Sequence, residues 1–194
     1  MKKTLTSLLV SAALFATGAQ ANIDTDLLSG IKARHIGPAA TSGRISDVEA
    51  VPSNPNIIYA SAASGGVWKS ENAGLNWKPI FDDQDWASTG ALAVNPNNPD
   101  IVWLGTGEGN VRNSTSIGGG IYKSIDGGKT WTNMGLEGTE RINRIALHPT
   151  NPDIAYAAAM GTLWSKNKER GVFKTTDGGK NWSKILYVDN VTGA

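Results

Sequence analysis

Short stretches in which apolar and polar residues roughly alternate recur along the chain, and after residue 21 no segment sustains the apolar spacing of a helix. Three of these stretches run into a Pro-x-Asn-Pro segment, which begins at Pro52, Pro96 and Pro149. A second apolar stretch follows each segment directly. Because prolines favour turns and cannot donate to a strand ladder, the pattern predicts pairs of strands joined by proline-containing turns.

A third apolar piece, Gly-x-aromatic-Lys-hydroxyl, follows each predicted pair of strands, at residues 66–70, 120–124 and 171–175. Each piece leads through a glycine-containing turn to a tryptophan, at positions 77, 131 and 182, which are 54 and 51 residues apart. We therefore expect four short strands in each repeat. A four-stranded repeat of about 50 residues is typical of a β-propeller blade.

This spacing predicts an all-β fold of about three four-stranded antiparallel blades, which form part of a larger propeller. The predicted blades span residues 44–87, 88–140 and 141–187, with a lead-in segment at 22–43 and the start of a truncated next blade at 188–194.

The turn before each tryptophan has its own signature, hydroxyl-x-Asp-x-Gly-x-x-Trp, with asparagine for aspartate in the first copy. A carboxylate or amide at this place accepts hydrogen bonds from the backbone of its own turn. We therefore assign a structural role to its repeated positions. These are Ser70, Asn72, Gly74 and Trp77, then Ser124, Asp126, Gly128 and Trp131, then Thr175, Asp177, Gly179 and Trp182.

The signature resembles the Asp-box, or BNR, repeat found in sialidases, sortilin-type receptors and xyloglucanase-like glycoside hydrolases. Together with the Pro-x-Asn-Pro turns, residues from about 35 to 194 are most similar to bacterial sortilin-like or xyloglucanase-like BNR proteins. The resemblance implies a larger propeller, so the chain would be partial, with its partners the remaining blades of a longer chain. Self-association of protomers into a ring and a four-bladed closure are the alternatives.

Composition limits the chemistry. The 194 residues carry a net charge of +1, no cysteine and two histidines, which excludes a thiolate metal site, a cysteine nucleophile and a multi-histidine centre. The near-zero charge argues against nucleic acid as a partner. We predict neither a metal nor a cofactor.

The pattern of the N-terminal residues predicts a targeting segment. Lys2 and Lys3 precede an apolar run over residues 5–16, and Ala19-Gln20-Ala21 matches a small-x-small cleavage site. We expect residues 1–21 to be a signal peptide that is cleaved after Ala21, which makes the protein secreted or periplasmic. No later segment is apolar enough to span a membrane.

Ligand recognition is expected on the loops between the second and third strands, which lie at the opposite end of each blade from the Asp-box turns. These loops differ in length, and long loops on a rigid scaffold often carry recognition. The candidates are Glu108, Asn110 and Arg112 in the second blade, Trp164 in the third, and Arg44, Asp47 and Arg144 on first strands that could line a channel. The alternatives are a solvated polar loop and a structural salt bridge between Arg44 and Asp47.

Catalysis is not predicted. In the xyloglucanases that the chain resembles, a catalytic aspartate lies in Tyr-Ala-Arg-Thr-Asp-x-Gly-Gly, and the matching segment at residues 59–66 has Ala63 in its place. Sialidases need an Arg-Ile-Pro motif, and Arg44-Ile45-Ser46 lacks the proline. We assign no catalytic residue and expect the loop face to bind a peptide or a carbohydrate. The alternatives are a fragment of a xyloglucanase-like hydrolase acting on β-glucan, and a truncation without activity of its own.

Overall fold

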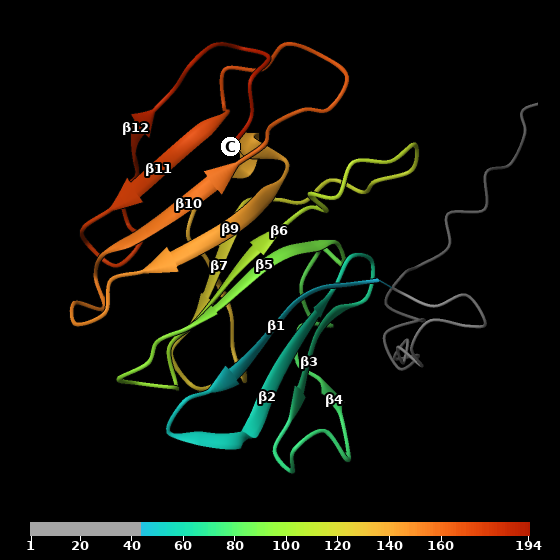
Figure 1. The fold of residues 1–194 in the computed structure, drawn as a ribbon, viewed down its shortest axis with the longest axis vertical. Coiled ribbons are helices and arrows are strands. Elements are labelled where there is room, and N and C mark those ends of the chain that lie inside the picture. The colour runs from blue at the N-terminus through green and yellow to red at the C-terminus, as the bar shows by residue number, and fades with distance from the viewer. Residues whose placement is uncertain (1–43) are drawn as a thin grey trace, which may run out of the picture. The chain divides into compact units, whose positions relative to one another are not determined.

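The computed structural model describes residues 44–194, so the predicted signal peptide and the lead-in segment lie outside the described residues. Residues 44–194 form three four-stranded antiparallel sheets, which confirms the predicted all-β class (Figure 1). The first sheet contains β1 (Ile45–Val51), β2 (Asn54–Ala62), β3 (Gly66–Ser70) and β4 (Lys78–Pro79). The second contains β5 (Thr89–Val94), β6 (Val102–Thr106), β7 (Ile121–Ser124) and β8 (Thr132–Asn133). The third contains β9 (Ile142–Leu147), β10 (Ala155–Ala159), β11 (Gly171–Thr175) and β12 (Ser183–Leu186).

In every sheet the strands pair in chain order, and the first strands of successive sheets, β1, β5 and β9, lie side by side. One 3₁₀ turn, η2 (Glu137–Thr139), links the second and third sheets. The fourth strands β4 and β8 have only two residues each, and they begin directly after the Asp-box tryptophan. Strands this short add little stability to an isolated sheet, so the sheets depend on packing against one another.

Two apolar cores fill the spaces between successive sheets. The core between the first and second sheets contains Val51, Tyr59, Val67, Phe81, Leu92, Val102, Leu104 and Tyr122. The core between the second and third contains Ala91, Ala93, Trp103, Ile121, Ile142, Ile145, Ala155 and Ala157. β6 contributes to both cores from its two faces, which is why its five residues are all buried.

Each Asp-box tryptophan of the second and third sheets donates a hydrogen bond to the sheet before it. Trp131 Nε1 donates to the carbonyl of Ile80 at 2.7 Å, and Trp182 Nε1 donates to the carbonyl of Met134 at 2.8 Å. Both acceptors lie three residues after the tryptophan of the preceding box. The ring thus covers its own hairpin, while its indole nitrogen holds its sheet in place against the preceding one.

A lysine on the third strand of the first and second sheets makes a complementary contact with the following sheet. Lys69 Nζ donates to the carbonyl of Gly127 at 3.1 Å, and Tyr59 Oη donates to the same carbonyl at 3.2 Å. In the second sheet Lys123 Nζ donates to the carbonyl of Gly178 at 3.0 Å. Each junction between sheets is therefore joined by one indole and one ammonium, placed at equivalent repeat positions.

The Asp-box turns are closed by their own side chains. In the second turn Ser124 Oγ donates to Asp126 Oδ1 at 2.8 Å, and the amide of Gly128 donates to Ser124 Oγ at 2.8 Å. The amide of Thr130 donates to Asp126 Oδ1 at 2.9 Å, and its hydroxyl donates to Oδ2 at 2.6 Å. These bonds to Thr130 hold the pKa of Asp126 at about 2, below its usual 3.8.

The first turn shows that the carboxylate charge is not needed for this geometry. Asn72 Oδ1 accepts a hydrogen bond from Ser70 Oγ at 3.1 Å and from the amide of Asn76 at 2.9 Å. The aspartate of the third turn follows the charged pattern, since the side chain and the amide of Asn181 lower the pKa of Asp177 to about 2.

These shifts predict an acid-sensitive contribution to stability. The two aspartates have a lower pKa in the folded state, so they stabilise the fold above about pH 4, and this stabilisation is lost as the pH falls towards 2. We expect the double variant Asp126→Asn/Asp177→Asn to lose less unfolding free energy than the wild type over this interval. Urea unfolding followed by tryptophan fluorescence at both pH values measures the difference. Equal losses in the two proteins would contradict the assignment.

A matched pair of glycines tests the packing between sheets. Gly74 and Gly179 hold the same box position with φ of 88° and 101°. A Cβ at Gly74 would meet only its own Trp77 at 3.7 Å, whereas one at Gly179 would lie 2.7 Å from the buried ring of Trp103. We expect Gly74→Ala to cost roughly 1–2 kcal/mol of backbone strain. Gly179→Ala should cost roughly 1–3 kcal/mol more, through overpacking. Urea unfolding measures both, and equal costs would show that the second junction is loose.

Candidate functional site

The loops between second and third strands lie at the opposite end of the sheets from the Asp-box turns, on the right in Figure 1. The longest of them joins β6 to β7 and spans residues 107–120. Its ends are fixed by backbone hydrogen bonds, from the amide of Gly107 to the carbonyl of Ser88 and from the amide of Gly118 to the carbonyl of Glu140. A Cβ at Gly107 would lie 1.9 Å from the Glu140 carbonyl, so only glycine allows this approach. The base of the loop is therefore rigidly placed between the second and third sheets.

Glu108 stands at this rigid base, with a side chain that is 0% exposed. Its Oε1 accepts a hydrogen bond from Arg44 Nη2, which comes from the residue before β1, and Arg112 Nε lies 3.7 Å from the same oxygen. Its Oε2 has no hydrogen-bond partner among the described residues. A buried carboxylate oxygen without a partner is costly, and in native proteins it often marks a functional position or a bound water. We call Arg44, Glu108 and Arg112 the loop-face cluster.

The alternative salt bridge between Arg44 and Asp47 is wrong, because Arg44 reaches across to Glu108 of the second sheet. Asp47 instead ties β1 to β5, since its Oδ2 accepts a hydrogen bond from the amide of Leu92 at 3.0 Å. Three candidates chosen from the sequence thus come together, and a fourth serves the contact between two sheets.

The remaining candidates lie apart from the loop-face cluster. No hydrogen bond or ion pair within residues 44–194 joins Asn110, Arg144 or Trp164 to Glu108. Arg144 is exposed on β9 and acts electrostatically on Glu49, whose pKa is raised by burial and by Asp47 and is partly lowered again by Arg144. The first strands therefore do place charges of both signs near one another.

Trp164 is 74% exposed on the loop between β10 and β11, residues 160–170. The buried side chain of Arg170 shapes this loop by donating to four backbone carbonyls. The acceptors are Asn190 at 3.1 Å, Met160 at 2.5 Å, Ser165 at 3.1 Å and Thr162. The tryptophan therefore stands on a loop that is fixed from within.

Sequence reasoning missed two residues that lie beside the base of the β6–β7 loop. Asn143 on β9 faces the loop so closely that a Cβ at Gly109 would lie 2.0 Å from its Oδ1, and this oxygen has no partner among the described residues. Arg141 is buried and donates to Glu140 Oε2 at 2.8 Å. The only signal for either was a polar residue beside the apolar positions of β9, which does not reveal a contact with a loop more than 30 residues earlier.

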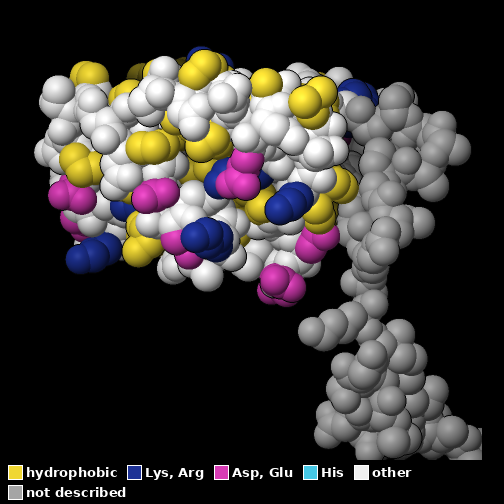
Figure 2. All heavy atoms as spheres, turned by 90° about the horizontal axis from the view of Figure 1, so that it is seen from below, with side chains coloured by type: hydrophobic (Ala, Val, Ile, Leu, Met, Phe, Trp, Pro, Cys, Tyr) yellow, Lys and Arg dark blue, Asp and Glu magenta, His cyan; other side chains and the backbone are white. Residues whose placement is uncertain are grey.

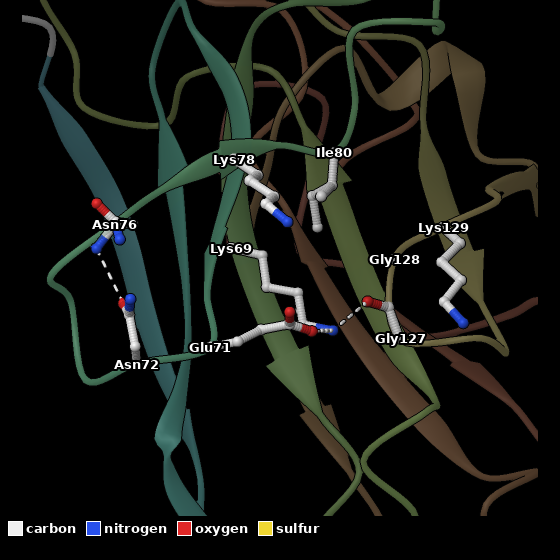
Figure 3. A pocket seen from close by; sticks show the side chains of 9 residues that line it. All are labelled: Lys69, Glu71, Asn72, Asn76, Lys78, Ile80, Gly127, Gly128 and Lys129. Atoms are coloured by element: carbon white, nitrogen blue, oxygen red, sulfur yellow. Dashed lines mark hydrogen bonds and ion pairs between the residues drawn. The ribbon is translucent and has the colours of Figure 1, made fainter.

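A groove of about 510 Å³ lies on the other end of the sheets, between the first and second Asp-box turns (Figure 3). Lys69 stands at its centre, between Glu71 at 3.2 Å and the carbonyl of Gly127 at 3.1 Å. Burial alone would lower the pKa of Lys69, but Tyr59 and Glu71 outweigh it and the pKa is raised. This ammonium already joins two sheets, so we interpret the groove as part of the contact between the first and second sheets and not as a ligand site. The equivalent groove between the second and third boxes has about 270 Å³.

Within residues 44–194 no group of three or more metal-ligating side chains comes together. The described part of the chain also has no helix that is long and apolar enough to cross a membrane.

Comparison with known proteins places this geometry in a family. The sequence profile described as "Sortilin, neurotensin receptor 3" (Sortilin-Vps10) matches residues 51–192. A xyloglucanase from Paenibacillus sp. is 30% identical over 152 residues, which cover 71% of this chain and 14% of that protein. An oligoxyloglucan-reducing end-specific xyloglucanase from Emericella nidulans is 26% identical over 156 residues, covering 74% and 18% respectively. The chain thus spans less than a fifth of these relatives.

Solved structures show the same architecture. An ancestral GH74 enzyme superposes with a TM-score of 0.62 at 24% identity, over 78% of this chain and 19% of that one. YCF48 bound to D1 peptide superposes with a TM-score of 0.54 at 15% identity, over 77% of this chain and 43% of the other. These neighbours confirm that the three sheets are β-propeller blades, as the Asp-box resemblance implied.

The loop-face cluster predicts unequal effects of two substitutions. Glu108→Ala removes the partner of Arg44, which is only 36% exposed, so we expect a loss of roughly 1–3 kcal/mol of unfolding free energy. Arg112→Ala breaks a longer contact of a half-exposed side chain and should cost less than about 1 kcal/mol. Urea unfolding measures both. An equally small loss for Glu108→Ala would show that the buried pair is not held as described.

Proposed function

The chain belongs to the Sortilin-Vps10 family, and from that premise we propose that it binds a polysaccharide of the β-glucan class through the face that carries the loop-face cluster. The observation that carries this proposal is Glu108, whose buried Oε2 has no partner among the described residues at the base of a rigid loop. Sugar hydroxyls donate hydrogen bonds to such oxygens. The related enzymes are named xyloglucanases, and xyloglucan is a polymer of this kind.

The surroundings of Glu108 suit a neutral, hydroxyl-rich ligand. Asn143 Oδ1 is a second acceptor without a partner in the described structure, and Arg112, half-exposed, supplies donors at the rim. The exposed ring of Trp164, on a loop of the same face, offers a flat apolar surface against which a sugar ring can pack.

Binding is favoured over hydrolysis because of Ala63. This residue takes the place of the aspartate in the xyloglucanase motif, is 1% exposed, and its amide donates to the carbonyl of Arg44 at 2.9 Å. A methyl group therefore fills the position next to the loop-face cluster where an acid would stand. Glycoside hydrolysis ordinarily uses two carboxyl groups roughly 5–10 Å apart. The competing proposal is that this segment belongs to a hydrolase whose acids lie elsewhere.

The proposal also covers the location of the protein and the residue ranges of its blades. A polysaccharide is met outside the cytoplasm, which agrees with cleavage after Ala21 and a secreted or periplasmic location. We assign the blades to residues 44–87, 88–140 and 141–187, each of which encloses one sheet.

Calorimetric titration with xyloglucan oligosaccharides tests this function. We expect saturable binding that Trp164→Ala weakens by about tenfold, a loss of roughly 1.4 kcal/mol. Ile125→Ala is the matched control, because this side chain is equally exposed, at 71% against 74%, but lies on an Asp-box turn. Absence of binding, or an equal effect of the control, would contradict the proposal. Release of reducing sugar that Glu108→Gln abolishes would establish hydrolysis instead, and binding of peptides alone would assign the face to a protein ligand.

A further inference from the structure

The loops that carry Glu108 and Trp164 leave the sheets at the same end, and both extend to the right in Figure 1. One joins β6 to β7, and the other joins β10 to β11. Within residues 44–194 no hydrogen bond or ion pair joins the two loops directly. The β8–β9 connection, residues 134–141, makes hydrogen bonds to both of them. The spacing between the two loops therefore depends on this connection.

Glu140 is the residue of the connection that contacts both loops. Its carbonyl accepts a hydrogen bond from the amide of Gly118 at 2.8 Å, near the end of the β6–β7 loop. Its Oε1 accepts a hydrogen bond from Thr162 Oγ1 at 3.4 Å, on the β10–β11 loop. The main chain of Glu140 is thus fixed to one loop, while its side chain reaches the other.

The neighbouring Arg141 orients the carboxylate of Glu140. Its buried guanidinium donates through Nη1 to Glu140 Oε2 at 2.8 Å and to the carbonyl of Gly161 at 3.4 Å. The amide of Met160 donates in turn to the carbonyl of Arg141 at 3.0 Å. Because the Glu140 side chain is only 29% exposed, this guanidinium contributes much of the stabilisation of its charge. The carboxylate is therefore held in one orientation, towards the β10–β11 loop.

Thr162 is fixed from the side of its own loop as well. Asn167 Nδ2 donates to Thr162 Oγ1 at 2.8 Å and to the carbonyl of Gly138 in the β8–β9 connection at 3.4 Å. The Thr162 hydroxyl thus accepts from Asn167 and donates to Glu140. Arg170 holds the β10–β11 loop together from within, whereas this short chain of hydrogen bonds fixes the loop to the rest of the protein.

The backbone of Glu140 is strained. Its φ is 55° and its ψ is −34°, a combination that residues with a side chain rarely adopt. Such a conformation persists only where the surroundings impose it. Here the Gly118 amide binds the carbonyl, and Gly107 lies so close that a Cβ on it would be 1.9 Å from the same oxygen. Glycine would be less strained at this position, so the presence of glutamate indicates that the carboxylate has a role.

Charge at a distance does not substitute for these contacts. The chain has a net charge of +1, and on the face shown in Figure 2 cationic and anionic side chains lie interspersed. Steering of a ligand over a distance needs a large patch of one sign. A neutral sugar ligand also responds little to such a patch. Its affinity therefore has to come from short contacts, which depend on how the two loops are spaced.

We propose that Glu140 is a positioning residue that sets the spacing of the two ligand-binding loops. Through Gly118 it holds the loop of Glu108, and through Thr162 it holds the loop of Trp164. Its effect on binding rests on the proposed polysaccharide function, whereas its effect on the loops concerns the protein without a ligand. Glu140 acts through the loops and does not itself contact the sugar.

Hydrogen exchange of the ligand-free chain tests the positioning. We expect the amides of residues 160–170 to exchange at least about tenfold faster in Glu140→Ala than in the wild type, while the amides of β6 keep their protection. Thr162→Val removes the same contact from the other side and should give the same result, even if Glu140→Ala fails to fold. Thr162→Ser keeps the hydroxyl and should exchange like the wild type.

Calorimetric titration with xyloglucan oligosaccharides tests the consequence for binding. We expect Glu140→Ala to weaken binding about tenfold in the wild type, but less than about twofold in the Trp164→Ala background. The second effect is smaller because the position of the β10–β11 loop no longer matters once the ring of Trp164 is removed. Glu137→Ala is the matched control, since it removes the same charge from an exposed side chain of the same connection, and it should bind and exchange like the wild type.

Two results would overturn the proposal. Unchanged exchange of residues 160–170 in Glu140→Ala and Thr162→Val would show that the carboxylate does not hold the loop. Equal weakening of binding with and without Trp164 would show that Glu140 acts by direct contact or through general stability. If the wild type does not bind the oligosaccharides at all, the polysaccharide proposal fails, and the exchange measurement still decides whether Glu140 positions the loops.

Discussion

The contact on which the rest of the structure depends is the hydrogen bond from an Asp-box tryptophan to a carbonyl of the preceding sheet. Each sheet ends in a strand of only a few residues and exposes apolar faces that cannot be stable alone. Trp131 and Trp182 lie between two sheets, with the ring packed against the apolar core and the indole nitrogen donating to a carbonyl of the preceding sheet. The order of the sheets, the seams between the boxes and the position of the loops all follow from this contact.

How much could be predicted from the sequence depended on how far apart in the chain the partners lie. The Asp-box turns were predicted because their hydrogen bonds join residues no more than four apart, as between Ser124, Asp126 and Gly128. Even the asparagine of the first turn keeps its role, because an amide oxygen accepts the same bonds as a carboxylate. Strand order was predictable for a similar reason, since neighbouring strands in the sheets are consecutive in the chain.

The candidate site was predictable only in part. Arg44 and Glu108 are 64 residues apart, and no periodicity connects them. Asp47 is closer to Arg44 in the sequence and was therefore the expected partner of Arg44. In the structure Asp47 instead accepts a hydrogen bond from the amide of Leu92 on the neighbouring strand. Asn143 could not be foreseen, because its position beside the loop depends on how the third sheet packs on the second. Long-range polar contacts of this kind are set by the junctions between sheets.

The position of the loop face is a consequence of the junctions between the sheets. Backbone hydrogen bonds to the neighbouring segments hold the base of the β6–β7 loop in place. The Glu108 carboxylate stays buried there although its Oε2 has no hydrogen-bond partner among the described residues. Among the described residues Trp77 has no preceding sheet, and its Nε1 donates to the carbonyl of Gly74 of its own turn.

Hydrogen exchange of the tryptophan indole protons, followed by NMR at low protein concentration, tests the central contact most directly. The account predicts that the Nε1 protons of Trp131 and Trp182 exchange as slowly as the amides of the buried strand β6, whereas that of Trp77 exchanges much faster. Rapid exchange at Trp131 and Trp182, or equal protection of all three indoles in the monomer, would contradict it.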